Sequence, residues 1–168
     1  MKRLFQIVLI SLSIVALFSS CGGDSKPAAK AEVKKAPAIP ETMALTIEGN
    51  DAMKFNKERL TVYEGQEITL TLKHVGQLTA DAMGHNWTLL AAGVDVDVFA
   101  MEAINYPDNE YLPPNSEAKI LARTRMLGGG ESESITFTAP AAGTYTYLCT
   151  FPGHYPMMKG KFVVKARK

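Results

Sequence analysis

Four side chains that bind soft metal ions lie within one short run near the C-terminal end of this 168-residue chain. The run CTFPGHYPMM, residues 149–158, combines a thiol, an imidazole and two thioethers. A further imidazole, His85, comes from a segment far upstream. Two histidines, one cysteine and a weakly held methionine form the ligand set of a blue-copper electron-transfer site. A chain with these donors must therefore adopt a fold that brings two remote segments together around one ion.

Short alternating segments separated by turn residues follow one another from residue 44 onward, and this pattern predicts β-strands. The expected strands span residues 44–48, 67–73, 87–90, 119–123, 134–138, 145–149 and 161–165. Residues 95–104, DVDVFAMEAI, instead favour a short helix outside the sheets. The prediction is an all-β fold, a Greek-key β-sandwich with one short helix.

Three segments around the metal-binding side chains resemble those of azurins, which are blue-copper proteins of the cupredoxin family. The segments are GNDAMKFN (49–56), MGHNW (83–87) and CTFPGH followed by MMKG (149–160), and they occur in azurin order. The resemblance covers roughly residues 44–166 and implies a cupredoxin-like sandwich. Plastocyanin-like proteins have a shorter gap between Cys and His, and a binuclear oxidase-type copper centre needs two cysteines in this loop.

The resemblance also implies which groups bind one copper ion. His85, Cys149 and His154 would be the strong ligands, Met158 the weak axial ligand, and the Gly84 carbonyl would lie opposite that methionine. Met157 is the obvious rival to Met158, but the azurin spacing selects Met158 and leaves Met157 toward the surface.

Several neighbours of these ligands are expected to support the site without binding the metal. Asn86 would brace the two ligand segments, and Phe151 would lie close to the ligands. His74 matches an azurin histidine outside the ligand set, where its titration would couple to the redox potential or where it would be a plain packed side chain. Trp87 is expected in the core.

The N-terminal residues have the layout of an export signal. Lys2 and Arg3 precede an apolar run from Leu4 to Phe18, which is shorter than the roughly 20 residues of a membrane-spanning helix. We expect residues 1–20 to be a signal peptide, with a transmembrane anchor as the alternative. Cys21 follows Ser19-Ser20 and resembles the acylated cysteine of a bacterial lipobox. The alternative is an ordinary cleaved signal with an incidental cysteine.

Residues 21–43 are expected to form a flexible tether because they are rich in Pro, Ala and Lys and poor in large apolar residues. Residues 44–168 would then form the cupredoxin domain. The chain has two cysteines. If Cys21 carries a lipid, Cys149 is left without a disulfide partner in an oxidising compartment. A Cys21–Cys149 disulfide is the structural alternative. The expected location is the periplasm, with the protein anchored to a membrane of the cell envelope.

The formal net charge is only +1, and nothing in it suggests a nucleic acid as a partner. The charge is nevertheless uneven. Six acids and no Lys or Arg lie between residues 88 and 118: Asp95, Asp97, Glu102, Asp108, Glu110 and Glu117. This acidic segment is interpreted either as a solvated face or as a docking patch.

The expected function is one-electron transfer without substrate turnover, by a monomer, between redox partners such as c-type cytochromes or membrane respiratory complexes. The resemblance implies an apolar docking patch around His154, formed by Met53, Leu78, Met83, Pro152, Gly153, Pro156 and Met157. Copper delivery or protection is the alternative, and a metal-free recognition module is a third reading. A nitrite reductase would need a second copper site and a longer chain.

Overall fold

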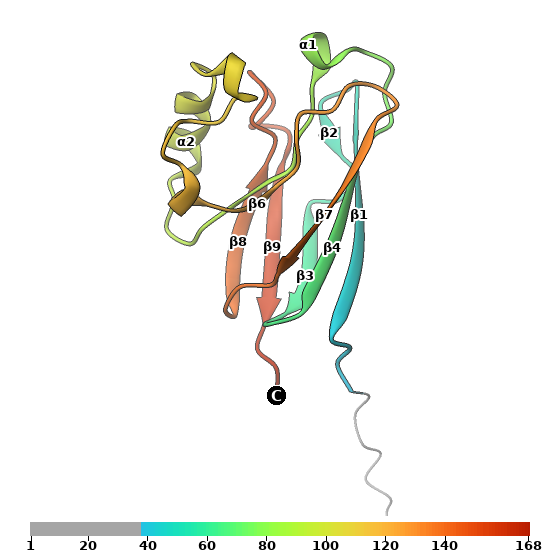
Figure 1. Ribbon diagram of the computed structural model, residues 1–168, viewed down its shortest axis with the longest axis vertical. Coiled ribbons are helices and arrows are strands. Elements are labelled where there is room, and N and C mark those ends of the chain that lie inside the picture. Colours follow the sequence, from blue (N-terminus) through green and yellow to red (C-terminus); the bar gives the residue numbers. More distant parts are fainter. Residues whose placement is uncertain (1–37) are drawn as a thin grey trace, which may run out of the picture. The chain divides into compact units, whose positions relative to one another are not determined.

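The computed structural model describes residues 38–168, so the expected signal peptide, Cys21 and most of the tether lie outside the described residues. Two β-sheets pack face to face and confirm the predicted sandwich (Figure 1). One sheet has four strands in the order β2-β1-β4-β7, and the other has five in the order β3-β9-β8-β5-β6. Within residues 38–168, no helix is long and apolar enough to cross a membrane.

The four-stranded sheet consists of β1 (Thr42–Asn50), β2 (Lys54–Phe55), β4 (Glu67–His74) and β7 (Ser132–Thr138). β1 runs parallel to β4, and β4 runs antiparallel to β7. The alternation in EITLTLKH buries Ile68, Leu70 and Leu72 between the sheets, as a period of two requires for a half-buried strand.

The five-stranded sheet consists of β3 (Arg59–Tyr63), β5 (Thr88–Leu90), β6 (Ile120–Arg123), β8 (Gly143–Leu148) and β9 (Lys159–Lys165). All seven predicted strands are present with ends shifted by a few residues. β2 and β3 were not predicted. β2 is too short to show a period, whereas β3 does alternate, because Leu60 and Val62 point inward.

The helices lie outside the sheets. They are α1 (Ala80–Met83), α2 (Val96–Ala103) and two 3-10 turns, η1 (Pro107–Asn109) and η2 (Glu117–Lys119). α2 confirms the expected helix, and Asp95 caps its start by accepting the N–H groups of Asp97 and Val98, each at 3.0 Å. Its inner face packs Phe99 and Ala100 against the five-stranded sheet.

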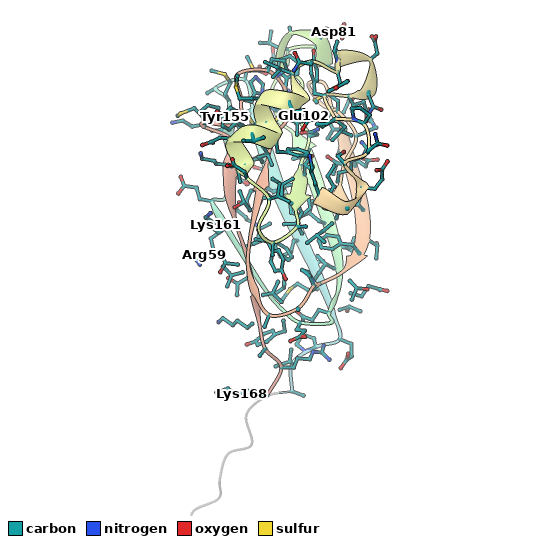
Figure 2. The ribbon with its side chains drawn as sticks, turned by 90° about the vertical axis from the view of Figure 1, so that its left-hand side faces the viewer. Arg59, Asp81, Glu102, Tyr155, Lys161 and Lys168 are labelled. Atoms are coloured by element: carbon teal, nitrogen blue, oxygen red, sulfur yellow. The ribbon has the colours of Figure 1, made fainter. Side chains whose placement is uncertain are left out.

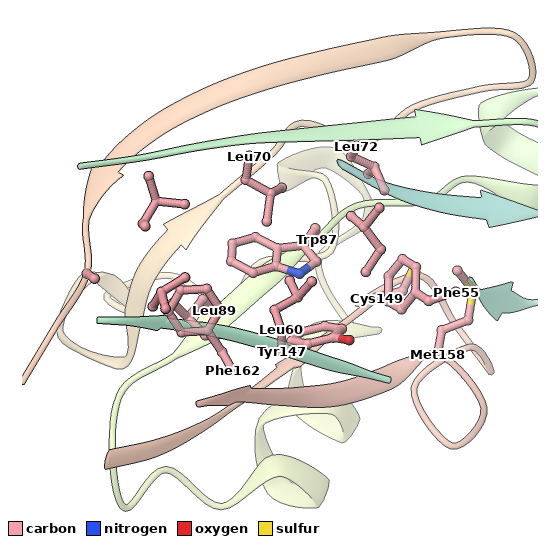
Figure 3. Close-up of a cluster of buried hydrophobic side chains, with 14 of the residues drawn as sticks. Phe55, Leu60, Leu70, Leu72, Trp87, Leu89, Tyr147, Cys149, Met158 and Phe162 are labelled. Carbon is pink, nitrogen blue, oxygen red and sulfur yellow. The ribbon is translucent and has the colours of Figure 1, made fainter. Parts of the chain in front are cut away.

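The core between the sheets centres on Trp87, which is fully buried as expected (Figure 3). Tyr147, Phe137 and Phe162 each have ring centroids about 6 Å from the Trp87 ring. Cys149 and Met158 lie together at one end of this core. The metal-binding side chains therefore close one end of the hydrophobic sandwich.

Candidate metal centre

The loop that joins β8 to β9 is held in one conformation by its own main chain. The Cys149 N–H donates to the Met158 carbonyl at 2.9 Å, and the Met158 N–H donates to the His154 carbonyl at 2.8 Å. The His154 N–H donates to the Phe151 carbonyl at 3.1 Å. Gly153 has φ of 80°, a backbone conformation that glycine adopts without steric cost. The loop thus presents Cys149 and His154 from a closed turn.

His85 enters from the segment between α1 and β5. Its main chain pairs with Leu127: the His85 N–H donates to the Leu127 carbonyl at 3.0 Å, and the Leu127 N–H donates to the His85 carbonyl at 2.8 Å. The next residue, Asn86, reaches the ligand loop directly. Its side-chain amide donates to Thr150 Oγ1 at 2.7 Å and its Oδ1 accepts the Thr150 N–H at 2.8 Å.

The donor atoms of three predicted ligands converge. Ligand atoms of His85, Cys149 and His154 all lie within 4.8 Å of one another, and all three residues are buried. Cys149 Sγ is 3.6 Å from His154 Nδ1 and 3.7 Å from the Gly84 carbonyl oxygen. Two imidazole nitrogens and a thiol sulfur can therefore bind one ion without a large rearrangement of the backbone.

The His85 ring shows that this convergence suits a metal ion. Its Nε2 lies 3.0 Å from the Asn50 carbonyl, which can only accept, so the proton is on Nε2. Nδ1 then carries a lone pair, is buried and has no hydrogen-bond partner among residues 38–168. A buried polar atom without a partner costs about 1–3 kcal/mol. A metal ion bound at Nδ1 removes that cost.

Burial sets the protonation states of the donors. It raises the pKa of the Cys149 thiol to about 11 and lowers the pKa of His154 to about 4. It also lowers the pKa of His85 below its ordinary value. Both imidazoles are thus neutral at pH 7 and ready to bind, whereas the thiol must lose its proton when a metal ion binds.

Met158 is fully buried and Met157 is 59% exposed, so the two adjacent methionines have opposite environments. Space for Met158 depends on Gly49, which the sequence analysis did not single out. A Cβ on Gly49 would lie 2.8 Å from His85 Cδ2 and 3.2 Å from Met158 Cε. A glycine inside a strand often marks such a close approach, and that is the signal that could have found it.

His74 supports His85 from the side away from the loop. The two rings stack with centroids 4.2 Å apart and an angle of 17° between their planes. His74 Nε2 is 2.8 Å from the Met83 carbonyl, and the Gly76 N–H donates to His74 Nδ1 at 3.1 Å. Both ring nitrogens of His74 therefore have partners, and the ring packs flat against that of His85.

Phe151 packs beside the other histidine, with its ring centroid 4.6 Å from that of His154. Tyr111, which the sequence analysis did not single out, meets Phe151 edge to face at 5.3 Å. Tyr111 follows η1 and lies far from the ligand loop in the sequence, so no local pattern could have indicated this contact.

The residues expected to form the docking patch come from three separate segments. Met53, Leu78, Gly153, Pro156 and Met157 are exposed, while Met83 and Pro152 are half-buried. Met53 has φ of 53°, which turns the chain between β1 and β2.

Comparison with known proteins shows which family the chain belongs to. The model for copper-binding proteins of the plastocyanin/azurin family matches residues 41–165. This chain belongs to that family. It is 36% identical over 162 residues to the azurin of Bordetella pertussis, across 94% of this chain and 96% of that protein.

Two further relatives extend this comparison. Outer membrane protein H.8 of Neisseria gonorrhoeae is 39% identical over 121 residues, across 70% of this cupredoxin and 65% of that protein. The solved structure of reduced auracyanin from Roseiflexus castenholzii superposes with a TM-score of 0.65 at 39% identity, across 76% of this chain and 99% of that one. Membership of this family, together with the donor set of His85, Cys149 and His154, identifies the cofactor as copper.

Proposed function

We propose that this cupredoxin is a one-electron carrier of the bacterial cell envelope. The observation that supports it most is the convergence of His85, Cys149 and His154 within 4.8 Å at a buried point beneath an exposed loop. Copper supplies a Cu(I)/Cu(II) couple at such a centre. The chain itself holds the donor atoms, excludes water from them and presents a surface next to His154.

The full ligand set in this proposal adds Met158 as a weak axial ligand and the Gly84 carbonyl on the other side. Met158 is fully buried, and its Cε lies close to Gly49, where an added Cβ would be only 3.2 Å away. The Gly84 oxygen lies 3.7 Å from Cys149 Sγ. Position Gly84 accepts no larger residue, because a Cβ there would lie 2.5 Å from the Ala80 carbonyl oxygen. Replacement of that glycine would move a proposed oxygen ligand.

The scaffold favours fast electron exchange because the donor atoms are already held in place before the metal ion binds. The hydrogen bonds between Asn86 and Thr150 join the two ligand segments, and the stacked His74 limits rotation of the His85 ring. A donor set that moves little between the two oxidation states requires little reorganisation when an electron arrives or leaves. Phe151 and Tyr111 fill the space beside His154 and contribute to the same rigidity.

Partners would dock on the apolar patch of Met53, Leu78, Met83, Pro152, Gly153, Pro156 and Met157. The exposure of Met53, Leu78 and Met157 supports this role, since Met and aromatic residues are enriched where proteins meet. A small patch suits brief contacts between redox carriers. The expected partners are c-type cytochromes or membrane respiratory complexes, and the expected carrier is a monomer that turns over no substrate.

We further propose that a lipid on Cys21 and the tether hold the domain at a membrane. The sequence pattern predicts a tether over residues 21–43, but Thr42 and Met43 belong to β1, so the proposed tether ends at residue 41. A related protein is named outer membrane protein H.8, which supports an envelope location. β1 begins at Thr42 at the end of the sandwich opposite α1 and the ligand loop (Figure 1). Tethering at that end leaves the metal end free for partners and raises their effective concentration.

Absorption spectroscopy of the copper-loaded protein tests the centre. We expect an intense band in the red from charge transfer between the Cys149 thiolate and Cu(II), and the Cys149→Ser variant should lack it. A protein that binds Cu(II) without colour would contradict the carrier proposal.

Electron exchange separates the carrier from copper delivery or protection. A carrier should exchange electrons reversibly with a small cytochrome and keep its copper, whereas a delivery protein should lose copper to an acceptor chelator. The lipid is tested separately by intact mass: the purified protein should carry the mass of acyl chains, and the Cys21→Ala variant should not.

A further inference from the structure

The outer face of α2 carries a stripe of apolar side chains that the core does not use. Val98 is 62% exposed, Met101 56% and Ile104, the residue that ends the helix, 39%. These residues are spaced by three positions and so lie along one side of the helix. The opposite side already buries Phe99 and Ala103. A surface helix normally presents polar residues to water, so this stripe has no explanation in packing.

The helix that carries the stripe adjoins the loop that holds the metal-binding residues. Tyr155, which lies between His154 and Pro156, packs against the cluster that includes Phe99 and Ala100 of α2. Figure 2 shows Tyr155 directly beside α2, on the surface of the molecule. The inner face of α2 and Tyr155 thus pack in one cluster, so the helix and the surface next to His154 are neighbours.

The charges around the stripe have mainly one sign. Asp95 and Asp97 are exposed at the start of α2, and Asp108 is exposed on η1. Within residues 38–168, Asp97 and Asp108 belong to no ion pair. Two cations belong to the same region: Lys119 pairs with Glu102 at 3.5 Å, and Lys159 lies 5.7 Å from the centre of the Tyr155 ring.

We propose that the stripe of Val98, Met101 and Ile104, with its acidic border, is a second docking surface for a redox protein whose own contact face is apolar and ringed by Lys or Arg. This inference rests on the proposed carrier function and adds a chemical class of partner to it. A second copy of this chain would bring like charges together, and so would the headgroups of an anionic membrane. A basic partner instead gains attraction at the border and burial at the centre.

A partner that covers both α2 and the ligand loop approaches from the side of Tyr155. The two surfaces together restrict its orientation more than the patch around Met157 does alone. Electrostatic attraction would raise the association rate, and salt would reduce this contribution.

The test uses the full copper-loaded protein, labelled with nitrogen-15 and solubilised in mild detergent, and a small c-type cytochrome with a lysine-ringed haem edge. Both proteins are kept reduced so that the nuclear magnetic resonance lines stay narrow. We expect the amide signals of residues 96–104 to shift on addition of the cytochrome, together with those of the ligand loop, and the shifts to shrink at high salt. The double variant Val98→Ser, Met101→Ser should lose the α2 shifts and slow electron exchange about tenfold.

A matched pair of charge variants tests whether the acidic border contributes to docking. Asp97→Asn should slow exchange at low salt, whereas Glu64→Gln, an exposed acid in the turn between β3 and β4, should leave the rate unchanged. The inference would be overturned if the amide shifts were confined to the ligand loop, or if the double variant exchanged electrons at the unchanged rate. Dimerisation through α2, or binding of α2 to anionic vesicles, would also overturn it. If the α2 signals shift but no electron is exchanged, the carrier function fails while the docking surface stands.

Discussion

Asn86 and Thr150 bind each other through two hydrogen bonds that join the two ligand segments. The Asn86 side-chain amide donates to Thr150 Oγ1 at 2.7 Å, and the Thr150 N–H donates to Asn86 Oδ1 at 2.8 Å. Each residue directly follows a metal-binding residue, His85 in one case and Cys149 in the other. The positions of the two ligands are therefore coupled through one fully buried amide.

Replacement of Asn86 by Ala should destabilise the protein and loosen the metal centre. The change leaves the buried Thr150 N–H without its acceptor, which costs about 1–3 kcal/mol. Thr150→Val keeps the main-chain bond and leaves one Asn86 amide N–H without its acceptor, but it conserves side-chain volume where Asn86→Ala also opens a cavity, so it should cost less. Urea unfolding of both variants measures the difference, and equal costs would contradict the importance assigned to the main-chain bond.

Replacement of Gly49 by Ala should disturb the centre by sterics alone. The new methyl group would lie 2.8 Å from His85 Cδ2, and we expect a loss of about 1–3 kcal/mol together with an altered copper spectrum. Gly143→Ala is the control, because its Cβ would meet nothing closer than 3.4 Å. An unchanged spectrum in Gly49→Ala would show that the His85 ring is not held where the structure places it.

The two adjacent methionines should respond differently to the same substitution. Met158→Leu removes a buried thioether from the centre and should raise the redox potential, because Cu(II) loses a donor. Met157→Leu changes a side chain that is 59% exposed and should leave both potential and spectrum unchanged. Electrochemistry of the copper-loaded variants measures the two redox potentials. A larger change in Met157→Leu than in Met158→Leu would make Met157 the axial ligand instead.

The metal-free protein should lose stability in mild acid. The pKa of His154 is about 4 in the folded protein because burial disfavours the imidazolium, whereas an unfolded histidine has a pKa of about 6.5. Below pH 6.5 the unfolded chain therefore binds protons that the folded chain does not, and stability falls until the pH reaches about 4. The lowered pKa of His85 acts in the same direction.

Urea midpoints of the metal-free protein at pH 7.5 and pH 5 measure this loss. The His154→Asn variant should show a smaller difference between the two pH values, since it removes one of the two contributing groups. An equally steep dependence in the variant would assign the effect to other residues.

The ligand loop could be predicted from the sequence because its contacts are local. Cys149, His154 and Met158 lie within ten consecutive residues, and their spacing is the same whether the chain is folded or not. The strands and α2 could be predicted for a similar reason, since a period of two or of 3.6 residues is a property of neighbouring positions. The family resemblance then identified His85 as the remote partner of the loop.

The tertiary structure decided which atoms those residues present and what surrounds them. The Asn50 carbonyl places the proton of His85 on Nε2, Gly49 makes room for Met158, and Tyr111 supports Phe151. Each of these contacts joins positions that are distant in sequence and meet only in the folded domain. The exposure of the α2 stripe also depends on packing, because the sequence of an isolated helix does not show which of its apolar sides the sheet will cover.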